Sequence, residues 1–265
     1  MILKATQNDI NSVKHFLNLD ADKNFFFIGD IDSYGVESTI HKTLIKVEQD
    51  EIVAVLLIFN QTLLFFDPYS KLCWSEINEI ILQNNLKNIN ISDDMFKKIE
   101  KYVKNENKYV IHQQIMAKLN HKININTDEV SKAELKDIPK IVESRLKIKE
   151  FANFANEYDH ELKVYTQSFT AGISNPFIIK NENNDVISCA LIAINADNKC
   201  FIGGVYTLNQ YRKQGLASKV VAKLSNWIIE QQKIPMLFYH NPEAGSVYRS
   251  LGYEEIGSLY TIIVK

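Results

Sequence analysis

The sequence predicts an α/β (mixed α+β) fold arranged as two tandem domains of similar design. Its 265 residues exceed the usual length of one domain, and 46% of them are hydrophobic, which is enough to bury two cores. Two patterns, an amphipathic helix and a β-hairpin, occur in the same order in each half. Such repetition favours duplication over a chance likeness between common patterns.

The first repeated pattern is a helix near the start of each half, in ATQNDINSVKHFL and AELKDIPKIVESRL. Apolar residues recur there at the spacing of one helix face. The matching positions lie 128 residues apart (133 − 5, 141 − 13) and pair Ala5 with Ala133, Asp9 with Asp137, Ile10 with Ile138 and Val13 with Ile141.

The second repeated pattern is a hairpin with a polar turn, in TLIKVEQDEIVAVLLIF and FIIKNENNDVISCALIA. Its matching positions lie 134 residues apart (179 − 45) and pair Ile45 with Ile179, Lys46 with Lys180, Ile52 with Val186 and Val53 with Ile187. The glycine-free stretch from Asn120 to Asp128 is the natural join. We therefore expect one domain over residues 1–122 and a second over residues 123–265.

Charge and cysteine usage limit the partners and the compartment. A net charge of −2 and a pI near 6.3 give no sign of the excess positive charge that binds nucleic acid or an anionic membrane. A small soluble partner is therefore expected. Cys73, Cys189 and Cys200 form no CxxC pair, which argues against a disulfide framework or a thiolate zinc site. No His or carboxylate cluster has metal-ligand spacing, so no metal is expected.

Targeting signals are also not evident. The start MILKATQND lacks a charged leader followed by an apolar region, and the longest apolar run, Ile52 to Phe59, is too short to span a bilayer. We therefore expect a protein of the reducing cytoplasm.

The segment GGVYTLNQYRKQGLASKVVAKL, residues 203–224, passes from a strand to a helix through a basic turn. The first N–H groups of a helix have no partner within it, and its dipole favours negative charge. Gly215 leaves the main chain open to an anion, and Arg212 and Lys213 add positive charge. The turn therefore predicts a phosphate site, although not a nucleotide P-loop, because GxxxxGK[ST] is absent.

With its flanking strand and helix, this turn resembles the acyl-CoA motif [RQ]xxGx[GA] of the GNAT superfamily of N-acyltransferases. It reads Arg212-Lys213-Gln214-Gly215-Leu216-Ala217 here. A second family feature follows in the expected order: the strand MLFYH, then Asn241 to Tyr248, then SLGYEEIG, similar to the family's N…A…YxxxGF/Y segment. The resemblance covers roughly the second half of the chain.

The resemblance implies two GNAT-like domains, each a mixed, mostly antiparallel sheet flanked by helices. It also implies a strand that splays from its neighbour and binds the pantetheine arm of CoA through its backbone. The expected cofactor-binding residues are Val205, Tyr206, Thr207, Arg212, Lys213, Gln214, Gly215, Leu216, Ala217, Ser218 and Asn241. Tyr248 is the expected general acid at the CoA sulfur, against the alternative that it only packs a helix.

The first half departs from the family pattern. After its strand TLLFFDP comes YSKLCWSEIN, with no glycine and no basic turn. It resembles a degenerate copy, and tandem GNAT proteins with one silent half are known as a class. We expect this half not to bind CoA.

The function implied is transfer of an acetyl group from acetyl-CoA to a primary amine in a ternary complex. An acyl-CoA sensor without turnover is the alternative, because the strand FIGGVYT carries no glutamate to act as base. The segment FANFANEYDHELKVYTQSF offers Glu157, Asp159, His160 and Glu161, either as a base or as a solvated face. His240, Cys189 and Cys200 are expected to be structural. A homodimer is possible.

Overall fold

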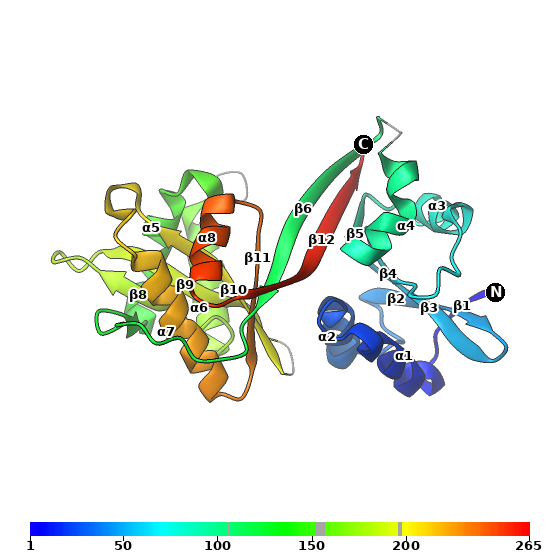
Figure 1. Cartoon of the computed structure of the whole chain (residues 1–265), viewed down its shortest axis with the longest axis horizontal. Coiled ribbons are helices and arrows are strands. Elements are labelled where there is room, and N and C mark those ends of the chain that lie inside the picture. The colour runs from blue at the N-terminus through cyan, green and yellow to red at the C-terminus, as the bar shows by residue number, and fades with distance from the viewer. Residues whose placement is uncertain (105–106, 152–156, 196–197) are drawn as a thin grey trace. The chain divides into compact units, whose positions relative to one another are not determined.

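The computed structural model describes residues 1–104, 107–151, 157–195 and 198–265. The first half of the chain forms β1 (Ile2–Lys4), α1 (Ile10–Leu17), α2 (Phe25–Tyr34), β2 (His41–Glu48), β3 (Glu51–Phe59), β4 (Thr62–Phe66), α3 (Trp74–Gln83), β5 (Asn88–Ser92), α4 (Asp93–Val103) and β6 (Tyr109–Lys118) (Figure 1). The second half forms β7 (Ser131–Lys132), α5 (Ile138–Leu146), α6 (Tyr158–Thr170), β8 (Phe177–Lys180), β9 (Val186–Asn195), β10 (Lys199–Thr207), α7 (Leu216–Glu230), β11 (Ile234–Tyr239), α8 (Pro242–Ser250) and β12 (Glu254–Val264). Helices and strands follow the same order in the two halves.

The chain divides into two compact units. The first unit comprises Met1–Ile115 together with Ile256–Lys265, and the second unit comprises Met116–Glu255. The first unit therefore contains most of β12, the last strand of the second half. The two units are defined by contacts in space, whereas the boundary expected between residues 122 and 123 divides the two repeats along the sequence. That boundary stays a prediction.

In each unit the strand pairing is mixed and mostly antiparallel, as expected. The first unit has the strand order β1-β2-β3-β4-β5-β12, in which only β4 and β5 run parallel among these pairs. In the second unit β11, β10, β9, β8 and β7 follow one another, and β10 and β11 are the parallel pair.

The repeated helices begin with the same local device. A short 3-10 turn precedes each one, and a carboxylate closes it: Asp9 Oδ2 accepts from the Thr6 N–H at 2.8 Å, and Asp137 Oδ2 accepts from the Glu134 N–H at 3.0 Å. These bonds satisfy N–H groups that have no partner inside the helix. The matched aspartates therefore share one structural role, which explains their fixed spacing.

The two expected hairpins are confirmed. Gln49 and Asp50 join β2 to β3 with φ values of 50° and 63°, the left-handed conformation that suits a two-residue hairpin turn. In the second unit β8 and β9 pair antiparallel across the polar turn that contains Asn184, whose φ is 62°.

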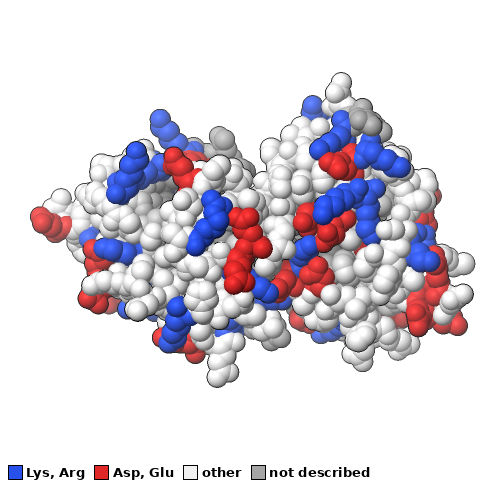
Figure 2. Space-filling model, viewed as in Figure 1, with Lys and Arg blue, Asp and Glu red and all other residues white. Residues whose placement is uncertain are grey.

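Surface charge gives no single-sign field on the face shown in Figure 2, where Lys and Arg are interspersed with Asp and Glu. This agrees with the small net charge of −2. In the described part of the chain, no helix is both long enough and apolar enough to span a membrane.

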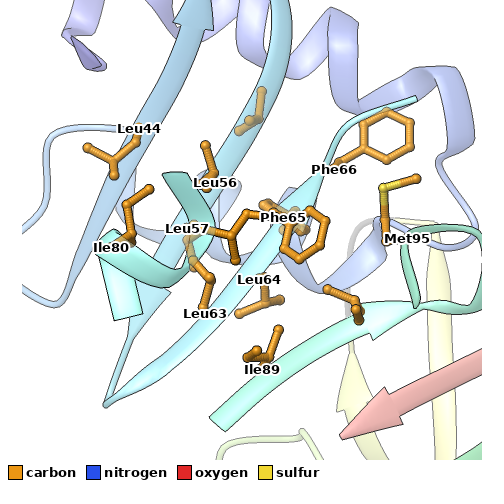
Figure 3. Packing of buried hydrophobic residues seen from close by; sticks show 14 of the residues in the cluster. Leu44, Leu56, Leu57, Leu63, Leu64, Phe65, Phe66, Ile80, Ile89 and Met95 are labelled. Carbon is orange, nitrogen blue, oxygen red and sulfur yellow. The ribbon is translucent and has the colours of Figure 1, made fainter. Parts of the chain in front are cut away.

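The core of the first unit lies between its sheet and its helices (Figure 3). Leu56, Leu57 and Leu63 from β3 and β4 are fully buried there, and Ile89 of β5 packs with them. Ile262 of β12 belongs to the same cluster and is also fully buried. The last strand thus contributes to the core of the first unit as well as to its sheet.

Candidate active site

The site begins where β10 and β11 separate. Their parallel pairing runs from Lys199 opposite Ile234 to Ile202 opposite Leu237 and then stops. Both strands continue, β10 to Thr207 and β11 to Tyr239. The expected splay is therefore present, and among the described residues no strand pairs with β10 on that side beyond Ile202.

Two glycines shape this part of β10. The register against β9 shifts between Gly203 and Tyr206, and Gly204 has a φ of 56°, so the strand carries a bulge where the splay begins. A Cβ on Gly203 would lie 2.8 Å from the Cβ of Ala193, closer than real contacts allow. The glycines thus permit both the bulge and the close approach of β9.

The side chains that follow the bulge point into the protein rather than offering polar groups to a ligand. The Tyr206 hydroxyl is bonded to Ser144 Oγ at 2.5 Å and donates to the Ile141 carbonyl at 3.1 Å. Thr207 Oγ1 is bonded to Ser188 Oγ at 2.9 Å. Residues 205–207 therefore offer a ligand mainly backbone groups, as expected for a strand that binds an extended amide chain.

The turn before α7 has the geometry of an anion site. Gly215 caps the helix with φ 74° and ψ 5°, and no heavy atom lies within 4 Å of the position that its Cβ would take. The first bond of the helix runs from the Lys219 N–H to the Gly215 carbonyl at 3.2 Å. The N–H groups of residues 216–218 therefore have no partner within the helix and surround open space.

Arg212 and Lys213, the two cations of the turn, differ in whether they bond to other groups of the protein. Arg212 Nε donates to the Thr207 carbonyl at 3.1 Å, and its guanidinium pairs with Glu150 at 3.0 Å. The hydrogen bond from Arg212 lowers the pKa of Glu150, so the carboxylate stays charged. Lys213 has no ion-pair partner among the described residues. Arg212 thus braces the turn against β10, while Lys213 remains available to a ligand.

Tyr248 lies on α8, which packs closely against β11. A Cβ on Gly245 would lie 2.4 Å from Cε2 of Tyr239, so only glycine allows this approach. The ring of Tyr248 contacts the rings of Tyr239 and Tyr253, at centroid distances of 5.6 and 6.0 Å. Burial raises the pKa of Tyr248 to about 12. Its hydroxyl makes no hydrogen bond to a described residue, so it is available to a ligand.

These parts line one cleft with a volume of about 340 Å³. All but one of the expected site residues lie on its wall: Val205, Tyr206, Thr207, Arg212, Lys213, Gly215, Leu216, Ala217, Ser218, Asn241 and Tyr248. Gln214 does not line the cleft. The Asn241 Oδ1 accepts from the Glu243 N–H at 2.9 Å and caps α8, so this side chain also has a structural role.

The acidic residues at the start of α6 do not line the cleft as a source of the base. Glu157, Asp159 and His160 are exposed and do not line the cleft. Glu161 is buried and pairs with Arg145 at 2.9 Å, so it is not part of a solvated face. The remaining part of this segment, residues 152–156, lies outside the described residues.

Other proton acceptors do line the cleft. His240 and Glu243 lie on its wall at the end of β11 and the start of α8. The sequence already offered the signal for His240, because it directly precedes Asn241. Cys189 and Cys200 are buried in strands, as expected, and burial raises the pKa of Cys189 to about 12. Within the described residues, no group of three His, Cys, Asp or Glu side chains could hold a metal ion.

Comparison with known proteins finds a matching domain in the second half of the chain. Residues 143–253 match the model of the Acetyltransferase (GNAT) family. The second unit contains a GNAT domain. All the expected site residues fall inside the matched range. No curated protein matches the sequence of this chain.

Solved GNAT structures share the fold along the whole chain. An acetyltransferase of the GNAT family from Colwellia psychrerythraea has a TM-score of 0.66 at 14% identity, with 100% of each chain covered. A GCN5-related N-acetyltransferase from Sphaerobacter thermophilus has a TM-score of 0.66 at 11% identity, covering 99% of this chain and 94% of its own. A tandem GNAT protein from the clavulanic acid biosynthesis pathway has a TM-score of 0.62 at 10% identity, covering 100% and 98%.

The first unit differs from the GNAT domain at the corresponding strand-to-helix turn. After β4 the buried Asp67 carboxylate accepts from the N–H groups of Lys71 and Leu72, at 2.8 and 2.9 Å. The Glu76 Oε2 accepts from the Cys73 N–H at 2.9 Å. Carboxylates of the protein itself therefore bond to backbone N–H groups of the turn that precedes α3, and their negative charge disfavours a phosphate there.

Proposed function

We propose that the protein is an N-acetyltransferase that transfers the acetyl group of acetyl-CoA to a primary amine of a small molecule or peptide. The observation that carries the proposal is one cleft that joins three features: the splayed edge of β10, the open N-terminus of α7 and the unpartnered hydroxyl of Tyr248. Each feature suits a different part of an acyl-CoA.

The donor is held mainly by backbone groups. Its pyrophosphate accepts hydrogen bonds from the N–H groups of residues 216–218, with Lys213 adding charge. Its pantetheine arm runs along residues 205–207 of β10 in the manner of an added strand. This arrangement places the thioester near the bulge, where a backbone N–H of β10 stabilises the developing oxyanion.

Proton transfer then completes direct attack in a ternary complex. The amine must lose a proton to become a nucleophile, because a free alkylamine has a pKa of about 10 and is mostly protonated at neutral pH. His240 lines the cleft and accepts this proton directly or through a water. The bond from nitrogen to the acetyl carbon forms, the carbon–sulfur bond breaks, and Tyr248 supplies a proton to the departing sulfur.

The proposal is tested by measuring thiol release from acetyl-CoA with a panel of primary amines, together with the mass of the product. We expect one or more amines to gain an acetyl group, and the gain to disappear in the Tyr248→Phe variant. Partners of this kind agree with the interspersed surface charge, and the free cysteines suit the reducing cytoplasm.

An acyl-CoA sensor is the competing candidate. It is favoured by the position of Glu157, Asp159 and His160 away from the cleft. A sensor binds acetyl-CoA tightly and releases no thiol with any amine in the panel. That result, with acetyl-CoA binding intact, would overturn the proposed reaction while leaving the donor site in place.

The chain is expected to bind one equivalent of acetyl-CoA, because the first unit has carboxylates, Asp67 and Glu76, at the turn before α3 where the second unit has a basic turn. Calorimetric titration of the full chain measures this stoichiometry directly. In a Gly215→Val variant no equivalent should bind with the affinity of the parent. Two equivalents in the parent, or one in the variant, would show that the first unit also binds the donor.

A further inference from the structure

One carboxylate of the cleft lies beside the turn where the donor phosphates are proposed to bind. Glu150 lines the cleft together with Arg212, Lys213 and Gly215. Both carboxylate oxygens contact the guanidinium of Arg212: Oε1 lies 3.0 Å from Nη1, and Oε2 accepts from Nη2 at 3.3 Å. The hydrogen bond from Arg212 lowers the pKa of Glu150, so the carboxylate is charged at neutral pH. A negative group of the protein is thus placed beside a site for negative ligands.

Glu150 binds the part of Arg212 that a phosphate would need. The Nε of Arg212 is committed to the structure, because it donates to the Thr207 carbonyl at 3.1 Å. Nη1 and Nη2 at the end of the guanidinium remain, and such a pair binds two oxygens of a carboxylate or of a phosphate in the same manner. Glu150 therefore occupies the paired donors that Arg212 has left for a ligand.

The segment that carries Glu150 is fixed on both sides of this residue. Ile148 is buried, and its carbonyl accepts from the Phe151 N–H at 3.1 Å, which closes a short 3-10 turn around Glu150. The Phe151 ring contacts the Tyr206 ring edge-on at a centroid distance of 6.3 Å, and the guanidinium of Arg145 lies 5.1 Å from its centroid. When the ion pair opens, the Glu150 carboxylate therefore stays beside the cleft.

The ion pair between Glu150 and Arg212 is weak enough for a phosphate to open it. The Glu150 side chain is 53% exposed and that of Arg212 is 41% exposed, and pairs exposed to this degree contribute little because water and salt screen them. A pyrophosphate carries more negative charge than one carboxylate, and the N–H groups of residues 216–218 attract it as well. The phosphates are therefore expected to replace Glu150 at Arg212.

We propose that Glu150 is a competitor of the donor phosphates, which binds Nη1 and Nη2 of Arg212 and gives way when acetyl-CoA binds. The inference rests on the proposed function, because it requires that acetyl-CoA binds in this cleft. The product CoA carries the same phosphates, so Glu150 opposes both ligands equally and favours the departure of CoA after transfer. Glu150 therefore sets the affinity for the donor without contacting the acetyl group.

Glu150→Gln tests the proposal, because glutamine keeps the shape of the side chain and removes its charge. Calorimetric titration of the full chain should show that this variant binds acetyl-CoA and CoA about fivefold more tightly than the parent, the upper end of what an exposed ion pair contributes. Glu230→Gln is the matched control. Glu230 is also 53% exposed and pairs with Lys122, but it lies at the other end of α7 and outside the cleft. The control should bind both ligands as the parent does.

The same change in an Arg212→Ala background shows whether Glu150 acts through Arg212. Most of the gain should then disappear, because the donors for which the carboxylate competes are gone. An undiminished gain there, an equal gain in Glu230→Gln, or an affinity in Glu150→Gln at or below that of the parent would overturn the inference. In each of these cases the parent still binds acetyl-CoA, so the proposed function stands. A parent that binds no acetyl-CoA would overturn the proposed function and this inference together.

Discussion

Replacing Gly215 with valine is expected to weaken acetyl-CoA binding roughly 100-fold or more. The branched side chain would enter the open space at the N-terminus of α7, where no heavy atom lies within 4 Å of the Cβ position. The pyrophosphate could then no longer reach the N–H groups of residues 216–218. Charge-assisted hydrogen bonds contribute about 1.5–3 kcal/mol each, so losing two of them accounts for an effect of this size.

Gly172→Val is the matched control for this substitution. Gly172 has a φ of 71° against 74° for Gly215, and it too has no heavy atom within 4 Å of its Cβ position. Both variants carry the same backbone strain, about 1–3 kcal/mol, but only Gly215 lines the cleft. Calorimetry should show lost affinity in Gly215→Val alone, and equal affinity in the two variants would place the donor elsewhere.

Tyr248→Phe is expected to lower kcat about 10²–10⁴-fold while leaving the Kd for acetyl-CoA close to that of the parent. Proton donation to a leaving group typically contributes a factor of this size. Phenylalanine keeps the buried ring and its contacts with Tyr239 and Tyr253, so the fold is preserved. Steady-state thiol release and calorimetry separate the two quantities. A kcat within a fewfold of the parent would mean that Tyr248 only packs.

The raised pKa of Tyr248 predicts how kcat depends on pH if Tyr248 donates a proton. With a pKa of about 12 the hydroxyl stays protonated through pH 10, so its ionisation produces no fall in kcat below that pH. The pH profile of the parent should therefore show no descending limb due to Tyr248 in the accessible range.

Tyr253→Phe controls for the loss of a buried hydroxyl. Tyr253 is fully buried beside Tyr248, and its hydroxyl is bonded to Ser225 Oγ at 2.7 Å outside the cleft. This change should lower the free energy of unfolding by about 1 kcal/mol and leave kcat unchanged. A similar fall in kcat for both variants would indicate a packing effect rather than proton donation.

Local patterns in the sequence were sufficient to predict the open turn before α7, whose role as the donor site stays a prediction. Gly215 and the apolar stripe that follows it are neighbours along the chain, and their spacing alone indicates an open helix N-terminus. The hairpins and the capped helices are likewise encoded within a few residues. The family resemblance added the splay of β10, which the end of pairing at Ile202 and Leu237 bears out.

Contacts between distant residues could not be predicted in this way. Arg212 pairs with Glu150, which is 62 residues away, so the sequence did not show that this cation is already engaged. The burial of Glu161 depends on Arg145 of another helix. Such features depend on tertiary structure, and no local pattern marks them.

The place of β12 in the first unit also determines when that unit can be completed during synthesis. Its strand neighbour β5 pairs with Leu259–Ile263, and these residues are made long after Ile115, the last residue of the unit's long segment. At about 5–20 residues per second, the ribosome needs roughly 7–28 s to pass from Ile115 to Ile256. The second unit is complete at Glu255, so the GNAT domain can fold first, although it comes second in the sequence. Until β12 is made, the edge of β5 in the segment Met1–Ile115 lacks the strand that pairs with it.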